Sequence, residues 1–227
     1  MRRLLCLLSS SIVVFHKDLV EFLPKRAKNK TVVACFGDFR TFIETQEEKN
    51  QEFSILSRSW MKLNGISSPD MVSISAAKRS NLKVLIEGVE DKNINTLIIA
   101  PNRKPETNVK CPKNVLFYTN FVREEVKMIL NTEHKIIGFI GHENKSVPTS
   151  IYMYASYGIP VIGLNGPPVN SIITEFQLGE VISDSSMIEE CVDKIRTNYS
   201  HYSNNCKVFL DKNSWEVSAD VHSKVFI

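Results

Sequence analysis

The hydrophobic positions of this 227-residue chain form short, uninterrupted apolar runs, separated by stretches in which apolar residues recur at helical spacing. Runs rich in Val and Ile that end in Gly or Pro are typical of strands buried on both faces of a sheet. We predict such strands at residues 31–37, 95–101, 115–118, 135–141 and 160–164.

Helical periodicity occupies the segments between these runs. We predict helices at residues 75–88, 122–131, 169–177, 186–197, 199–210 and 215–225. The alternation of strands and helices predicts an α/β fold with one parallel sheet of five or six strands, covered on both faces. Right-handed crossovers then make it a Rossmann-like, doubly wound sheet. We expect Ile98, Leu116, Ile137 and Val161 in its buried middle.

The first thirty residues differ from the rest, because they hold seven Lys or Arg against two acids. Arg2 and Arg3 followed by an apolar run have the outline of a signal peptide, but no small-residue cleavage site follows Phe15. The alternative, which we prefer, is a strand at 11–15 followed by an amphipathic helix from Lys17 to about Arg26. We therefore divide the chain into an N-terminal strand/helix segment, 1–29, and a Rossmann-like domain, 30–227.

Composition excludes several classes of protein. The net charge of +3 is too small for a nucleic-acid-binding protein. Five scattered cysteines without CxxC spacing predict neither a metal site nor a disulfide framework, and they fit a reducing compartment. We expect a cytoplasmic protein, either free or peripheral at a membrane, where the basic and apolar N-terminal residues would contact an anionic surface.

The segment 147–163 has the most specific pattern. Pro148 suits the first turn of a helix, Ile151 and Ala155 give that helix a buried face, and Gly158 ends it before a Pro-Val-Ile strand. A loop that leads into a helix N-terminus is a natural site for an anion, because the free N–H groups point outward.

This segment resembles the donor-site stretch of GT-B glycosyltransferases of the group 1, family 4-like type, which often read Pro-Thr-Lys-Leu-Tyr-Glu-Tyr-Leu-Ala-Ser-Gly-Lys-Pro-Val-Ile. The matching residues are Pro148, Thr149, Tyr152, Tyr154, Gly158, Pro160, Val161 and Ile162. Met153 stands where the family usually has a Glu that binds the donor ribose, and Ser150 where Lys is frequent. The resemblance covers residues 31–226 in outline and 135–182 in detail.

The resemblance implies that the chain is the C-terminal, nucleotide-sugar-binding half of such an enzyme, with residues 1–29 as a remnant of a missing acceptor domain. The donor would be a UDP- or GDP-linked sugar, and no metal or other cofactor is expected. Strand ends and matched motifs together predict the donor-binding residues. They are Gly37, Arg40, Arg103, Lys104, Asn120, Phe121, His142, Glu143, Ser146, Pro148, Thr149, Tyr152 and Met153.

An acceptor base would belong to the other half of a GT-B enzyme, so no catalytic residue is predicted here. The chain would transfer a sugar to a glycan or lipid-linked acceptor, and it would work with an acceptor-domain partner subunit or as a homo-oligomer. Two alternatives stay open. One is a non-catalytic, glycosyltransferase-like subunit that binds a partner protein or a glycan, which Met153 favours; the other is a different Rossmann-like nucleotide binder, such as a sugar-nucleotide epimerase.

Overall fold

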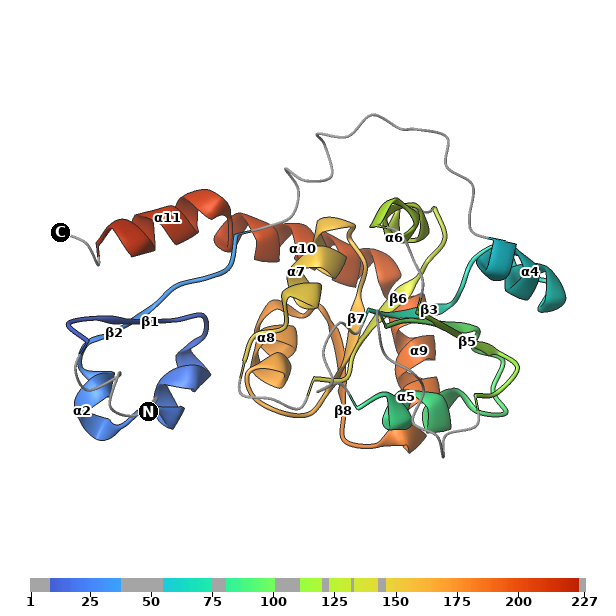
Figure 1. Ribbon diagram of the computed structural model, residues 1–227, viewed down its shortest axis with the longest axis horizontal. Coiled ribbons are helices and arrows are strands. Elements are labelled where there is room, and N and C mark those ends of the chain that lie inside the picture. Colours follow the sequence, from blue (N-terminus) through green and yellow to red (C-terminus); the bar gives the residue numbers. More distant parts are fainter. Residues whose placement is uncertain are drawn as a thin grey trace.

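The computed structural model describes residues 9–37, 55–74, 81–100, 111–119, 123–131, 133–142 and 146–224. Its centre is a six-stranded sheet with the strand order β5-β4-β3-β6-β7-β8, in which every pairing is parallel. The strands are β3 (Met71–Ile74), β4 (Thr96–Ile99), β5 (Val115–Tyr118), β6 (Ile137–Ile140), β7 (Val161–Leu164) and β8 (Gly179–Ile182). The predicted doubly wound α/β sheet is confirmed (Figure 1).

Helices cover both faces of this sheet, and each face has its own hydrophobic cluster. Residues of α6 (Arg123–Leu130), α7 (Thr149–Ser156), α8 (Val169–Phe176) and α10 (Tyr199–Lys212) pack in one cluster. Residues of α5 (Leu82–Val89) and α9 (Ile188–Thr197) pack in the other. The strands alternate between the two, so Leu97 and Ile99 face one layer and Ile98 faces the other. Three further helices of the described chain after residue 37 are α4 (Ile55–Leu63), η2 (Ser185–Met187) and α11 (Trp215–Ser223).

Three of the four residues expected in the buried middle are there: Ile98, Ile137 and Val161 are at most 2% exposed and share one sheet. Leu116 is only partly buried, because β5 is an edge strand. The expectation of a large-sheet strand at 31–37 is wrong, since only Thr31–Val33 are extended and they lie in a separate sheet. The central strand β3 was not predicted at all.

Residues 9–37 form a small βαβ unit, called the N-terminal unit below. Strand β1 (Ile12–Val14) pairs in parallel with β2 (Thr31–Val33), which confirms a strand within 11–15. The predicted continuous helix from 17 to 26 is wrong. The 3-10 helix η1 (Lys17–Phe22) ends before Pro24, and α2 (Lys25–Lys28) begins after it, because proline disfavours a helical residue before it. The division at residues 29 and 30 stays a prediction.

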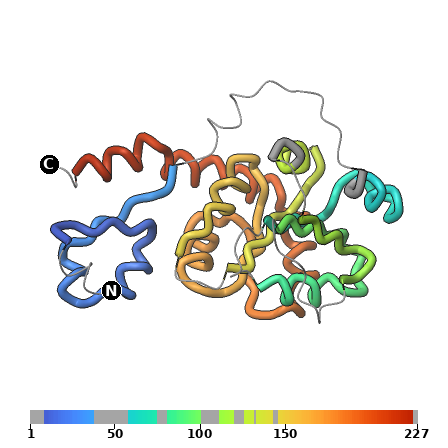
Figure 2. Tube along the Cα trace, in the orientation of Figure 1, coloured from blue at the N-terminus to red at the C-terminus, as the bar shows by residue number. Residues whose placement is uncertain are grey.

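The N-terminal unit is attached to the main domain through its last residues and α11, which extends beside it (Figures 1 and 2). Phe15 and Phe36 stack with ring centroids 4.0 Å apart, and Ser218 Oγ donates a hydrogen bond of 2.7 Å to the carbonyl oxygen of Cys35. Gly37 lies on the indole of Trp215 so closely that a Cβ at this position would come within 1.8 Å of the ring. Gly37 is required here by space rather than by a positive φ angle.

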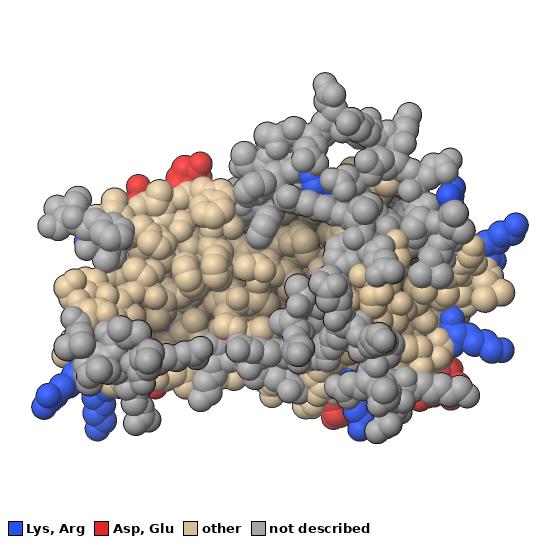
Figure 3. Space-filling view, in the orientation of Figure 1, with Lys and Arg blue, Asp and Glu red and all other residues tan. Residues whose placement is uncertain are grey.

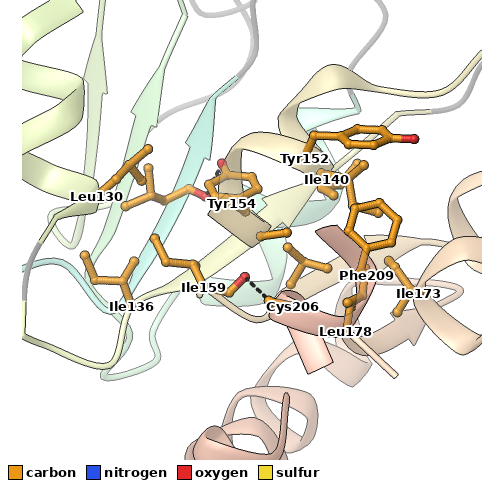
Figure 4. Packing of buried hydrophobic residues seen from close by; sticks show 14 of the residues in the cluster. Leu130, Ile136, Ile140, Tyr152, Tyr154, Ile159, Ile173, Leu178, Cys206 and Phe209 are labelled. Atoms are coloured by element: carbon orange, nitrogen blue, oxygen red, sulfur yellow. Dashed lines mark hydrogen bonds between the residues drawn. The ribbon is translucent and has the colours of Figure 1, made fainter. Parts of the chain in front are cut away.

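Tyr154 provides hydrogen bonds to the central strand β3 of the large sheet. The register of β3 with β6 covers only Met71–Ile137 and Val72–Gly138, after which the two strands separate. In a continued parallel ladder, the next residue of β6 would bond the carbonyl of Val72 and the N–H of Ile74. The hydroxyl of Tyr154 does both instead: it donates to Val72 O and accepts from Ile74 N, each at 2.9 Å. Its ring is fully buried against Gly138, among the residues shown in Figure 4.

We expect Tyr154→Phe to lower the free energy of unfolding by about 2–4 kcal/mol, because a buried carbonyl and a buried N–H both lose their partner. Urea unfolding followed by circular dichroism measures this. Tyr199→Phe is the matched control, since it removes a single bond, from the phenol to Ile136 O at 2.9 Å, in a half-buried place. A loss at Tyr154 no larger than that at Tyr199 would contradict the double role of the hydroxyl.

We expect Gly37→Ala to destabilise the protein by about 1–3 kcal/mol, because the added methyl group collides with the Trp215 ring. The double variant Gly37→Ala/Trp215→Ala makes room for the methyl group. Its free energy of unfolding should therefore exceed the value expected if the effects of the two single variants simply added. Strict additivity in this double-mutant cycle would show that the collision is not the cause.

Candidate functional site

The candidate site lies where β3 and β6 separate at their carboxyl ends. Ligands of open α/β sheets bind in the crevice outside these ends, at the point where the strand order reverses. In this sheet the order reverses between β3 and β6. The N–H of Asn81 donates a bond of 2.7 Å to Gly141 O, so the segments that follow these two strands meet at this point.

The stretch from β6 to α7 supplies polar groups there. His142 Nε2 and Ser146 Oγ lie 2.8 Å apart, while Val147 and Pro148 are buried and fix the approach to the helix. Pro148 occupies the N-cap position without a side-chain cap. Thr149 is exposed, and the N–H groups of Thr149 and Ser150 have no acceptor among the described residues. Unpaired N–H groups at a helix start, together with the helix dipole, favour an anion.

The rest of α7 follows the predicted pattern. Ile151 and Ala155 are buried at 0% and 3% exposure, and Gly158 adopts a φ angle of 66°, which ends the helix as predicted. Pro160 then leads into β7 (Figure 1). The local sequence therefore sets both the start and the end of the helix that carries the candidate site.

Tyr152 and Met153 are placed differently from the loop residues. Tyr152 is 2% exposed and packs on Phe209, with centroids 4.9 Å apart, and edge-on to Phe36 at 5.8 Å. Burial raises the pKa of the Tyr152 phenol well above its usual value, and a hydrogen bond with the Phe36 backbone opposes the shift only in part. Tyr152 therefore supports α7 from the core (Figure 4). Met153 is half-buried against the same cluster and has no carboxylate to offer a ribose.

The structure brings together four of the predicted donor-binding residues, His142, Ser146, Pro148 and Thr149, on one loop and helix start. Gly37 is placed beside Phe36 and under Trp215, at the junction with the N-terminal unit. The remaining predicted donor-binding residues lie outside the described part of the chain: Arg40, Arg103, Lys104, Asn120, Phe121 and Glu143. Their roles, and the donor-binding role of the whole set, stay predictions.

Two residues that shape the site were not predicted as part of it. Tyr154 matches the motif, but nothing in the sequence indicated that it would replace a strand as hydrogen-bond partner. Asn81 donates its N–H to the carbonyl oxygen of Gly141, the residue after β6. It also caps α5, because its side-chain oxygen accepts a hydrogen bond from Val84 N at 3.4 Å. An Asn before an apolar helical stretch is a recognisable N-cap signal, and it could have located the start of α5.

No group of three His, Cys, Asp or Glu side chains suited to a metal ion occurs among the residues that the structure describes. Within the same residues, no helix is long and apolar enough to cross a membrane.

Solved structures with the same fold include several glycosyltransferases. A glycosyltransferase from Rickettsia africae is 12% identical, with a TM-score of 0.71 over 96% of this chain and 64% of that chain. Sucrose-phosphate synthase from Thermosynechococcus elongatus is 10% identical, with a TM-score of 0.70 over 99% of this chain and 59% of that one. Anabaena HepE in complex with UDP-glucose is 10% identical, with a TM-score of 0.65 over 96% and 63%.

No protein-family model and no curated protein sequence matches the chain. The chain spans about three fifths of the length of these neighbours, 64%, 59% and 63% respectively. At such low identity the likeness establishes the fold, and the six-stranded order and the parallel pairings agree with it. The chain therefore has the Rossmann-like fold of the C-terminal domain of GT-B glycosyltransferases.

Proposed function

We propose that this chain is the donor-binding part of a glycosyltransferase, which transfers a sugar from a UDP- or GDP-linked donor to a glycan or lipid-linked acceptor. One observation carries the proposal. The start of α7 has two N–H groups without an acceptor among the described residues, and it follows the loop that leaves β6, the strand that separates from β3. A nucleotide diphosphate suits this place, because its charge faces the positive end of the helix.

The chemistry required of such a domain is electrostatic. When the sugar leaves, negative charge develops on the terminal phosphate, and preorganised N–H donors lower the barrier by stabilising that charge. The N–H groups of Thr149 and Ser150 are suited to this task, with the hydroxyl of Thr149 beside them. His142 holds the hydroxyl of Ser146 in place on the same loop. In this proposal no metal takes part.

The acceptor and its base would be supplied by structure outside this domain. The nucleotide sugar is a reasonable ligand because neighbours with this fold include HepE in complex with UDP-glucose. An acceptor-domain partner, and a cytoplasmic place free or peripheral at a membrane, complete the proposal. Which sugar is transferred, a hexose or another, depends on which nucleotide sugar binds.

A second candidate function is a non-catalytic subunit that keeps the fold and binds a partner protein or a glycan. Met153 favours it, because a half-buried thioether packed on the core stands where a ribose-binding carboxylate is expected. The two candidates differ in one measurable property, which is affinity for nucleotide sugars.

We expect Thr149→Pro to weaken binding of UDP-glucose or GDP-mannose about 10- to 100-fold, in isothermal titration calorimetry. Proline at the first helical position removes one N–H without disturbing the helix, and Pro148 already has the extended conformation that must precede a proline, with ψ at 125°. Hydrogen bonds to charged groups contribute about 1.5–3 kcal/mol. Thr149→Ala is the control that removes only the hydroxyl. Equal binding by all three proteins would rule out the phosphate site at α7.

We expect Met153→Glu to tighten nucleotide-sugar binding several-fold if the ribose lies over α7, since a carboxylate accepts two hydroxyl bonds. Met153→Gln controls for polarity without charge. No binding of any nucleotide sugar by the parent chain or by Met153→Glu would favour the non-catalytic subunit.

A further inference from the structure

The amino ends of β3 and β6 are tied together, although their carboxyl ends separate. Ile137 N donates to Asp70 O at 2.9 Å, immediately before β3 begins. The carboxylate of Asp70 accepts from Asn95 N at 2.7 Å, just before β4, and forms an ion pair with Arg196 of α9. Strand β3 is therefore fixed at this end to β4, β6 and α9, and the separation from β6 is a local feature of the carboxyl ends.

The backbone N–H of Ile74 has two possible acceptors. In β6, Gly138 N donates to Pro160 O at 2.8 Å, so Gly138 faces β7 and, by alternation, Phe139 faces β3. Extending the ladder by one pair would bring Phe139 O to Ile74 N. The register ends one pair earlier, and Ile74 N donates to the hydroxyl of Tyr154 at 2.9 Å. The phenol oxygen thus stands in the place of a strand carbonyl.

The ring of Tyr154 prevents the strands from closing. It lies flat on β6, because a Cβ at Gly138 would be 2.8, 2.8 and 2.9 Å from three carbons of the ring. Tyr154 is 0% exposed, and a close-packed interior leaves such a ring no room to move aside. To pair with Ile74, Phe139 would have to enter the space that the phenol fills. Ring and hydroxyl therefore have separate tasks: the ring sets the gap, and the hydroxyl bonds β3 across it.

Charge does not separate the two strands. Neither β3 (Met-Val-Ser-Ile) nor β6 (Ile-Gly-Phe-Ile) contains a charged residue. On the face shown in Figure 3, uncharged residues occupy the middle of the described surface, and the visible Lys and Arg side chains project mainly from its margins. Burial raises the pKa of the Tyr154 phenol well above its usual value, so this group stays neutral too. The gap is thus held by the size of a neutral side chain.

We infer that Tyr154 is a positioning residue, which holds the crevice between β3 and β6 open and thereby sets where a ligand of this crevice binds. It acts through β6, on which its ring lies, and through α7, of which it is part. If β6 closed onto β3, the segment after Ile140 would be drawn toward β3, and the start of α7 would move with it. The inference rests on the proposed function for the identity of the ligand, whereas the spacing is a property of the sheet alone.

Two variants separate the ring from the hydroxyl. Tyr154→Phe keeps the ring, so the strands stay apart and Ile74 N loses its acceptor. Tyr154→Leu removes the ring, so β6 closes and Phe139 O accepts from Ile74 N. The scalar coupling through this hydrogen bond, between Ile74 ¹⁵N and Phe139 ¹³C′, reports the closure by NMR of the deuterated full chain. We expect the coupling in Tyr154→Leu alone. A coupling in the parent or in Tyr154→Phe, or none in a folded Tyr154→Leu, would overturn the inference.

A second measurement needs only the conservative variant. In Tyr154→Phe, the Ile74 amide should exchange with deuterium at least about tenfold faster than in the parent. The amide of Asn165, which donates to Ile182 O at 2.7 Å between β7 and β8, corrects for the general loss of stability. An Ile74 amide that stays as protected as in the parent would mean that β6 closes in spite of the ring, which contradicts the role of the ring as a spacer.

Titration calorimetry with UDP-glucose and GDP-mannose connects the spacing to binding. Tyr154→Phe should bind within about threefold of the parent and Tyr154→Leu at least about tenfold more weakly, because charge-assisted hydrogen bonds at the helix start depend on its position. Tyr199→Leu, which removes a half-buried phenol elsewhere, is the matched control and should bind within about twofold of the parent. Equal losses in both Leu variants would refute the positioning role. If the parent binds neither sugar, the proposed function fails, while the NMR coupling still decides whether Tyr154 holds the strands apart.

Discussion

The separation of β3 from β6 is the constraint around which the domain is arranged. A crevice at the point where the strand order reverses requires two central strands to separate. Backbone N–H and C=O groups of these strands then lose their partners inside a core that excludes water. Leaving them unpaired would cost several kcal/mol. The phenol of Tyr154 meets both needs, because a single hydroxyl donates to one backbone group and accepts from the other.

This solution also determines where the candidate site lies. Tyr154 is part of α7, so bonding its hydroxyl to β3 fixes the position of the helix over the sheet. The approach of its ring to the strand needs Gly138, because a Cβ there would come within 2.8 Å of the ring. The start of the same helix, at Thr149, is thereby held beside the crevice. The position of the predicted phosphate site therefore depends on a residue whose side chain is bonded to the sheet.

The apolar runs were sufficient to predict the class of fold, but not which strands belong together. The run at 31–37 is longer and more apolar than Met71–Ile74, yet β3 occupies the centre of the large sheet and β2 pairs only with β1. Periodicity reports burial, whereas membership of a sheet depends on contacts distant in sequence. Strand β3 also contains Ser73, which is 1% exposed. This polar residue interrupts the apolar run, so a prediction based on hydrophobicity missed the strand.

The resemblance located the loop and helix start but could not assign directions to the side chains. Tyr152 and Tyr154 are two residues apart, so they point to opposite sides of α7, and both are nevertheless buried. This is possible because α7 lies between the sheet and α10: Tyr154 reaches β3, while Tyr152 packs on Phe209. The loops with the predicted cations lie outside the described residues, so the helix start is the part of the predicted anion site that the structure places.

The helix α7 also joins the site to the N-terminal unit. Tyr152 contacts Phe36, Phe36 stacks on Phe15, and the adjoining Gly37 lies on Trp215 of α11. Moving the N-terminal unit relative to the large sheet would break this aromatic chain, together with the bond from Ser218 to Cys35. The N-terminal unit and the start of α7 are thus carried on one packed framework.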